Sequence, residues 1–230
     1  VVHADWYIPF ENNLKWTEDG ERLFFGIKPK EEEFYPKDEV KFADSTFYSI
    51  DTILKENTVD VWHWNDPRIK PHQKKWWKRH KDRVYDCVYY PAEKTFIQLA
   101  NMEVPEVRFT DNPNFTIGYN EGPYLRLQTW EGFFYDMYLV NLKDGSRKRI
   151  AEKIFEQGHL SPLGKYVAFY KDKNWHLHDN FKDTLWNMSE VIKSEFWDVD
   201  LDEPRRPGSY GLGGWTSGDS SVFIYDKYDI

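Results

Sequence analysis

Apolar and polar residues alternate in short runs along most of the chain, and turn-forming residues separate the runs. In residues 166–170 the side chains of Val167 and Phe169 fall on one face, because successive residues of a β-strand point to opposite sides. Turn residues follow at 172–174, and a second apolar run returns at 175–178. This pattern predicts a β-hairpin.

Two further pairs of apolar runs have the same layout of strand, tight turn and strand. The turns are rich in Gly, Asp, Lys and Pro, which favour chain reversal. Strand pairs of this kind along the whole chain indicate an all-β protein. The predicted pairs are residues 135–142 with 147–150, and residues 83–90 with 95–99.

A longer segment recurs along the chain with variations. Each copy has an apolar opening residue, then Ser or Thr, a polar turn, and an apolar strand. The copies open at Trp16, Phe109, Leu160 and Trp215, of which the copy at Phe109 is the weakest, and the intervals are 93, 51 and 55 residues. Blades of β-propellers run to ~40–50 residues with four antiparallel strands. We therefore expect a partial β-propeller with a short helical insertion.

The spacing of the copies divides residues 1–230 into blades. Residues 14–99, 107–155 and 158–200 are each expected to form one blade, and residues 213–230 to begin a further one. The long first interval fits either one blade with an insertion at about 28–82 or two blades, one of which has lost its opening residue. We favour the insertion.

The insertion is expected to begin as a charged, exposed loop and to continue with a strand within residues 58–66. Asp66 is the predicted N-cap of a helix and Pro67 its first residue, since Pro at that position needs no backbone N–H. The helix runs to Lys81 and can restart at Pro71. Ile69, Trp76 and His80 would share one face, with Trp77 beside them.

The charge of the chain narrows the function classes. A net charge of -8 argues against a nucleic-acid-binding surface. The basic run at 72–83 is interpreted as a solvated helix that buries its Trp pair.

No apolar run approaches the ~20 residues of a membrane span. The single cysteine, Cys87, excludes an internal disulfide and lies in a strand-like run, so a buried and inert thiol is expected.

Both ends of the sequence suggest an excised part of a longer protein. The first residues contain neither Met nor a signal-peptide pattern, and Ile230 directly follows a strand-like run. A partial propeller leaves strand edges without partners, and such edges pair with other chains. Self-association through open strand edges is therefore expected.

Two groups of residues have the spacing of metal ligands. His176 and His178 lie on one face of a predicted strand, but no third ligand follows from the spacing. Asp198, Asp200 and Asp202 resemble part of a calcium loop that lacks its glycine and its distal glutamate. A strand over 197–201 with one wet face is the preferred interpretation. We predict no metal and no cofactor.

The sequence contains no complete catalytic constellation. G-x-S-x-G is absent, and residues 208–211 approach it with the wrong spacing. The P-loop, G-x-G-x-x-G and H-E-x-x-H motifs are also absent. We therefore predict no catalytic residue in this chain.

The candidates for substrate binding are Glu31, Glu32 and Glu33, which could recognise an amine, although an acidic, proline-flanked loop is usually only solvated.

Three stretches of the chain resemble a known family. Residues 160–169, LSPLGKYVAF, resemble the S-P-D-G-K-x-[IVL]-A-[FY] repeat of propeller domains in the prolyl oligopeptidase family, with Leu163 in the place of Asp. Residues 60–73 and 207–230 look like segments of the large secreted bacterial members, which include dipeptidyl peptidases. The resemblance covers most of the chain from about Leu14.

The resemblance implies a two-part enzyme. In this family an N-terminal propeller caps a C-terminal α/β-hydrolase domain that carries the catalytic triad, and the propeller restricts access to short or unfolded peptides. No triad residue has a counterpart here, so the chain would be a non-catalytic segment of a periplasmic or secreted serine peptidase that gates peptide access and docks on the hydrolase domain. In the dipeptidyl peptidase branch a Glu pair binds the substrate amino terminus, but the flanks of Glu31, Glu32 and Glu33 do not match that motif.

Two other classes of function remain open from the sequence. A stand-alone binding propeller for glycan or protein partners would use exposed Trp side chains along one face. A propeller that is itself a lyase or glycosidase would need paired carboxylates or a metal at its central channel. No such pair can be placed from the sequence, so this class ranks last.

Overall fold

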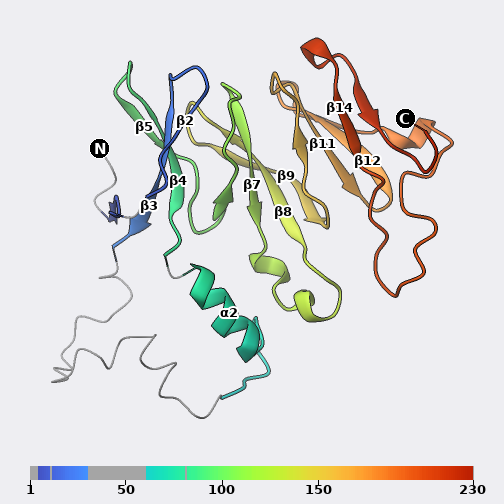
Figure 1. Cartoon of the computed structure of the whole chain (residues 1–230), viewed down its shortest axis with the longest axis horizontal. Coiled ribbons are helices and arrows are strands. Elements are labelled where there is room, and N and C mark those ends of the chain that lie inside the picture. Colours follow the sequence, from blue (N-terminus) through green and yellow to red (C-terminus); the bar gives the residue numbers. More distant parts are fainter. Residues whose placement is uncertain (1–4, 11, 31–60, 81, 230) are drawn as a thin grey trace.

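The computed structural model describes residues 5–10, 12–30, 61–80 and 82–229 (Figure 1). These residues form four antiparallel β-sheets that lie side by side, which confirms the all-β prediction. No helix in this part of the chain has the length and apolar character that crossing a bilayer requires.

The first sheet contains strands from both sides of the predicted insertion. β3 (Leu23–Pro29) pairs with β4 (Tyr85–Tyr90), which pairs with β5 (Thr95–Gln98). Two short strands, β1 (Trp6–Tyr7) and β2 (Lys15–Trp16), both pair with β3. The insertion between β3 and β4 therefore leaves the sheet and returns to its neighbouring strand.

The next two sheets are four-stranded meanders, and the last is a hairpin. In each sheet the strands follow one another in sequence order, so every connection is local. The second sheet contains β6 (Glu106–Val107), β7 (Phe115–Asn120), β8 (Tyr135–Asn141) and β9 (Arg147–Ile154); the third contains β10 (His159–Leu160), β11 (Tyr166–Lys171), β12 (Asn174–Asp179) and β13 (Thr184–Asn187); the fourth contains β14 (Leu212–Trp215) and β15 (Val222–Ile224).

The predicted strand pairs are confirmed. β8 pairs with β9, β11 with β12, and β4 with β5. The predicted run at 83–90 begins two residues late, at Tyr85, and the run at 147–150 extends to Ile154. Where a strand ends depends on how far the neighbouring strand continues beside it. The alternation of residues within one segment does not reveal this.

Central strands bury side chains on both faces, and this holds neighbouring sheets together. On β11, Val167 and Phe169 pack against the second sheet, whereas Ala168 and Tyr170 pack toward β14 and β15. β8 behaves in the same way, with Met137 and Leu139 facing the third sheet and Tyr138 and Val140 facing the first. The sheets are therefore stacked in sequence order with an apolar layer between each pair.

The turns that precede β3, β7, β11 and β15 lie at one end of the sheets, which we call the turn end. Arg22, only 2% exposed, donates from Nη2 to the Asp111 carbonyl at 2.7 Å and from Nη1 to the Asn112 carbonyl. The Glu18 N–H donates to Asp111 Oδ1 at 2.9 Å. The first repeat is thus tied to the second by its turn.

The same kind of bond continues to the third and fourth repeats. Asn112 donates from Nδ2 to the Pro162 carbonyl at 3.1 Å. Asp219, 3% exposed, accepts from Ser161 Oγ at 2.6 Å and from the N–H groups of Leu163 and Lys165 at 3.1 and 3.3 Å. Four successive turns are therefore joined in one chain of hydrogen bonds, which we call the turn chain.

The turn chain explains how the third repeat folds with Leu163 in place of an Asp. In the first repeat, Asp19 accepts from Thr17 Oγ1 at 2.5 Å and from the Glu21 N–H at 2.9 Å. In the third repeat the equivalent donors are Ser161 Oγ and the Lys165 N–H, and both bind Asp219 instead. The fourth repeat therefore supplies the carboxylate that the third one lacks.

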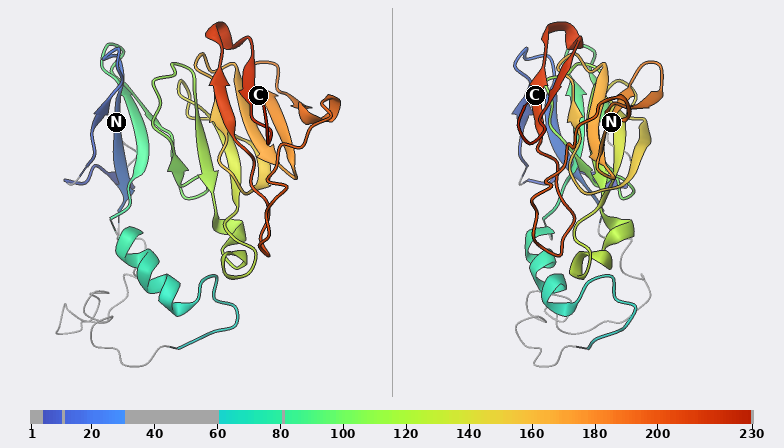
Figure 2. Two further views of the ribbon diagram at one scale, coloured as in Figure 1. Left: turned by 45° about the vertical axis from the view of Figure 1, so that its right-hand side comes forward. Right: turned by 90° about the vertical axis from the view of Figure 1, so that its right-hand side faces the viewer.

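The opposite end of the sheets, which we call the helix end, carries the larger connections (Figure 2). Helix α2 (Lys70–His80) lies there, below β3 and β4, together with the 3-10 helices η3 (Gly122–Tyr124) and η4 (Leu127–Thr129). Two further 3-10 helices, η5 (Ser189–Val191) and η6 (Ser217–Asp219), lie in other connections. The helices of the predicted insertion and of the connection between β7 and β8 thus lie at the same end of the sheets.

Two details of the predicted insertion are wrong. The helix begins at Lys70, with Pro71 as its second residue, and not at Pro67. Asp66 instead forms an ion pair with Lys70 at 3.2 Å. Residues 61–66 form no strand, because the Asp66 N–H donates to the His63 carbonyl at 3.0 Å and closes a turn.

The predicted strand over 197–201 is also wrong. Trp197 forms a single isolated bridge with Ser209. Asp198 then accepts a hydrogen bond from the Asp200 N–H at 3.1 Å, and the chain turns. An Asp side chain that binds the backbone two residues later favours a turn over an extended strand, and this local bond overrides the alternation.

Self-association is predicted from the sheet edges. Among the described residues, β15 pairs only with β14, which leaves one of its edges without a strand partner. Edge strands of this kind pair with other chains. We expect sedimentation velocity to show dimers or larger species whose fraction rises with concentration. A compact monomer at all concentrations would contradict this prediction.

Asp86 on β4 is predicted to make stability depend on pH. Burial raises the pKa of its carboxyl from 3.8 to about 6, although Lys15 and Arg83 act in the opposite direction. The folded chain therefore holds this proton more tightly than the unfolded chain, so its stabilising contribution is present below about pH 4 and is lost as the pH rises through about 6.

We expect Asp86→Asn to raise the free energy of unfolding at neutral pH by about 2 kcal/mol, a value reduced for solvent screening because the residue is only half-buried. Urea unfolding on both sides of pH 6 measures the effect. An Asp86→Asn variant that keeps the pH dependence of the original chain would contradict it, and Asp144→Asn, on an exposed turn, serves as the control.

Candidate functional site

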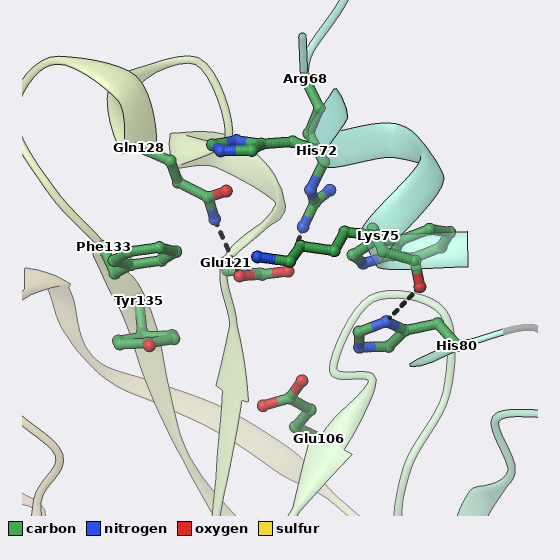
Figure 3. Close-up of a pocket in the computed structure, with 10 residues that line it drawn as sticks. Arg68, His72, Lys75, His80, Glu106, Glu121, Gln128, Phe133 and Tyr135 are labelled. Atoms are coloured by element: carbon green, nitrogen blue, oxygen red, sulfur yellow. Dashed lines mark hydrogen bonds and ion pairs between the residues drawn. The ribbon is translucent and has the colours of Figure 1, made fainter. Parts of the chain in front are cut away.

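A pocket of ≈ 320 Å³ lies at the helix end between α2 and the second sheet (Figure 3). We call it the α2 pocket. Residues of the insertion form one wall, and residues near the ends of β6, β7 and β8 form the other. Its lining consists of Arg68, His72, Lys75, Trp76, His80, Glu106, Glu121, Gln128, Phe133 and Tyr135.

Glu121 joins the two walls of the α2 pocket. It follows β7 directly, and its Oε1 pairs with the Arg68 guanidinium while its Oε2 accepts from Gln128 Nε2 at 2.9 Å. The Arg68 guanidinium also lies over the Trp76 ring, 5.1 Å from its centroid. A carboxylate with charged and neutral donors on its two oxygens is held in one orientation, and it fixes α2 against the second sheet.

Aromatic and charged contacts continue along α2. The rings of Trp76 and His80 are stacked, with centroids 4.7 Å apart and an interplanar angle of 9°. His80 Nδ1 lies 2.8 Å from the Trp76 carbonyl, the geometry in which the ring N–H donates to the backbone. On the facing strand β6, Glu106 pairs with Arg83 at 2.7 Å. Both acids of the pocket are therefore neutralised by Arg.

The second sheet supplies an aromatic wall. Tyr135 is half-buried and packs edge-on against Tyr119, with ring centroids 5.9 Å apart. Burial raises the pKa of Tyr135, and the charges of Glu121 and Glu106 raise it further, so its hydroxyl stays protonated at neutral pH. Phe133 is 52% exposed and presents an apolar face to the pocket.

The side chains of Lys75 and His72 can donate hydrogen bonds to a ligand in the pocket. Neither side chain forms an ion pair with a described carboxylate, and Figure 3 shows the Lys75 amino group reaching into the pocket. No Ser, Thr or Cys lines this pocket. The arrangement can bind a polar ligand between cationic donors and aromatic rings.

A second pocket, of ≈ 370 Å³, lies on the side of α2 that faces the first sheet. Arg68, Trp76, His80 and Glu121 line both pockets, so these four side chains form a shared partition. A change at any of them would alter both pockets.

The residues predicted as substrate ligands cannot be placed. Glu31, Glu32 and Glu33 lie outside the described residues. Nothing among the described residues groups three or more His, Cys, Asp or Glu side chains around a possible metal ion.

The two histidines of β12 have separate surroundings. His178 is buried and uses both ring nitrogens, which lie 3.0 Å from Asn180 Oδ1 and 3.2 Å from Asp183 Oδ1. His176 stacks on Phe169 with centroids 5.3 Å apart, and burial lowers the pKa of its imidazole. His178 is thus held by polar partners and His176 by ring stacking, and each side chain has its own structural contacts.

The remaining sequence candidates have structural partners. The Asp200 carboxylate forms an ion pair with Lys227 at 2.6 Å. The Ser209 hydroxyl donates to Glu156 Oε2 at 2.6 Å, which is no catalytic triad. Cys87 is fully buried, as expected, and burial strongly raises the pKa of its thiol, so it is unreactive at neutral pH.

Comparison with known proteins does not identify a family. The chain matches no protein-family model, and it matches no curated protein.

Proposed function

We propose that this chain is a non-catalytic β-propeller segment of a prolyl oligopeptidase-family serine peptidase. The observation that supports this proposal best is the stacking of successive antiparallel sheets in sequence order, joined at one end by the turn chain. A propeller is built in this way, because each blade covers the apolar face of the next. The repeat in residues 160–169 that resembles the family motif forms one link of that chain.

In this proposal the helix end gates peptide access. The α2 pocket offers Lys75 and His72 as donors beside Phe133 and Tyr135, which suits an extended peptide with carbonyl groups and apolar side chains. The catalytic Ser belongs to an α/β-hydrolase domain outside this chain, on which the propeller docks. The parent protein would act in the periplasm or outside the cell.

The test is to isolate the natural gene product with an antibody raised against this chain and to treat it with a biotinylated fluorophosphonate, which labels activated serines. We expect labelling of a polypeptide that is larger than this chain. Pretreatment with an unlabelled serine-hydrolase inhibitor is the control and should abolish the signal. A natural product that resists labelling while a known serine peptidase in the same extract reacts would overturn the proposal.

A stand-alone binding propeller is the alternative, and one surface favours it. Trp62, Trp64 and Trp130 are 60%, 87% and 86% exposed and line one pocket of ≈ 400 Å³ beside α2. Large exposed aromatic side chains that gather in one place are typical of binding sites. Quenching of Trp fluorescence by oligosaccharides, lost in a Trp64→Ala variant, together with a natural product without an activated serine, would favour this function.

A further inference from the structure

A third pocket at the helix end, of ≈ 300 Å³, differs from the α2 pocket in its chemistry. It lies between the end of β9 and the turn that joins β11 to β12. Since β9 and β11 belong to neighbouring sheets, the pocket opens at the seam between them. Its lining consists of Phe134, Lys153, Phe155, Tyr170, Lys171, Asp172, Lys173, Arg206 and Pro207.

This seam pocket has a surplus of positive charge. Four of its residues are cationic and one is acidic. Glu131, just outside the lining, pairs with Lys153 at 3.2 Å and with Arg206 at 3.5 Å. Lys171 and Lys173 form no ion pair with any carboxylate in the described parts of the chain. The net charge of the chain, -8, repels anions at long range. These cations attract an anion locally, at the pocket itself.

Tight turns shape the backbone around the seam pocket. Asp172 and Lys173 are the two central residues of the hairpin turn between β11 and β12, a turn type that requires positive φ at both positions. Lys153, Asp172 and Lys173 have φ angles of 49°, 49° and 66°. Buried Asp136 holds the first of them, because it accepts the Lys153 N–H at 3.1 Å. The hairpin turn and this hydrogen bond fix the backbone segments that carry Lys153, Lys171 and Lys173.

Aromatic rings position the cations. Phe134 is 1% exposed, and the Lys153 ammonium and Arg206 guanidinium lie 4.9 and 5.1 Å from its centroid. The Lys173 ammonium lies 3.5 Å from the centroid of the Trp197 ring. These contacts hold long, flexible side chains in place, so less conformational entropy is lost when an anion binds.

We propose that the seam pocket binds an acidic peptide segment, one that carries carboxylates next to an aromatic or aliphatic side chain. The cations fit the carboxylates, and Phe155 and Pro207 give apolar surface that a free inorganic anion would not use. Charge complementarity identifies the occupant as acidic, and the mixed lining identifies it as a peptide. The proposal rests on this pocket alone and requires no hydrolase domain.

Fluorescence anisotropy tests the proposal with a fluorescein-labelled hexapeptide in which Glu and Phe alternate. We expect saturable binding that weakens with added salt, because exposed charges are screened. A matched peptide with Gln in place of Glu should bind at least about tenfold more weakly. Equal binding of the two peptides would overturn the proposal.

Two charge reversals locate the site. Lys171→Glu and Lys173→Glu should each weaken binding of the acidic peptide by about tenfold. Lys143→Glu is the matched control, since it changes the net charge equally at an exposed position of the turn between β8 and β9. Equal losses in all three variants, each with an unchanged melting temperature, would show a non-specific effect of net charge and overturn the proposal. Competition by inorganic phosphate as strong as by the unlabelled peptide would also overturn it.

Discussion

Replacement of Phe169 by Ala is expected to lower the free energy of unfolding by about 4 kcal/mol, the usual cost of removing a large aromatic side chain from a packed interior. Phe169 is 1% exposed on β11 and lies in the apolar layer between the second and third sheets. Its removal would leave a cavity where two sheets meet, and the sheets cannot close it without moving relative to one another.

Urea unfolding followed by circular dichroism measures this loss, with Phe223→Ala as the control. Phe223 lies on β15 and is 47% exposed, so its truncation should cost only about 1 kcal/mol. Similar losses in the two variants would show that the layer between the sheets does not carry the stability of the fold, and would contradict the stacked arrangement.

Replacement of Asp219 by Ala is expected to cost about 3 kcal/mol. The change removes a buried carboxylate that accepts from Ser161 and from two backbone N–H groups, and hydrogen bonds to a charged group are the stronger kind. It also removes the acceptor of the buried Ser161 hydroxyl. The backbone adds to the loss, since residue 219 has a φ of 55°, which Ala adopts less readily than Asp.

Asp219→Asn separates these contributions. Asn tolerates the left-handed conformation and keeps one acceptor oxygen, so we expect it to lose about half as much stability as Ala, again in urea unfolding. Ser161→Ala should remove the bond from its hydroxyl to Asp219 and the bond that this hydroxyl accepts from the Tyr166 N–H, and cost about 2 kcal/mol. A loss in Asp219→Ala no larger than in Ser161→Ala would contradict the role of Asp219 as the acceptor of several donors.

The strands of the repeats were predictable because local alternation and turn chemistry specify them. Val167 and Phe169 were placed on one face from the sequence, and both pack against the second sheet. The predictions failed where one local hydrogen bond overrides the alternation. The Asp198 side chain turns the chain where a strand was expected, and a turn from His63 to Asp66 delays the start of α2.

The α2 pocket could not be predicted in the same way. Its helix wall was visible in the sequence, since Trp76 and His80 were placed on one face of a predicted helix. Glu121 and Gln128 come from the connection between β7 and β8, and Tyr135 begins β8; they meet that helix only because the insertion folds across the end of the second sheet. No local pattern marks a contact between residues 53 positions apart, such as the pair of Arg68 and Glu121.

Leu163 and Asp219 have a consequence for how such repeats can diverge. Ser161 Oγ and the Lys165 N–H have one carboxylate, which comes from the following repeat. An Asp restored at position 163 would compete with Asp219 for the same donors and would place two like charges side by side. An Asp at position 163 would therefore stabilise or destabilise the fold according to whether the following repeat supplies its own carboxylate at position 219. Neighbouring repeats are epistatic, so an exchanged or duplicated repeat keeps its stability only if it is inherited together with its successor.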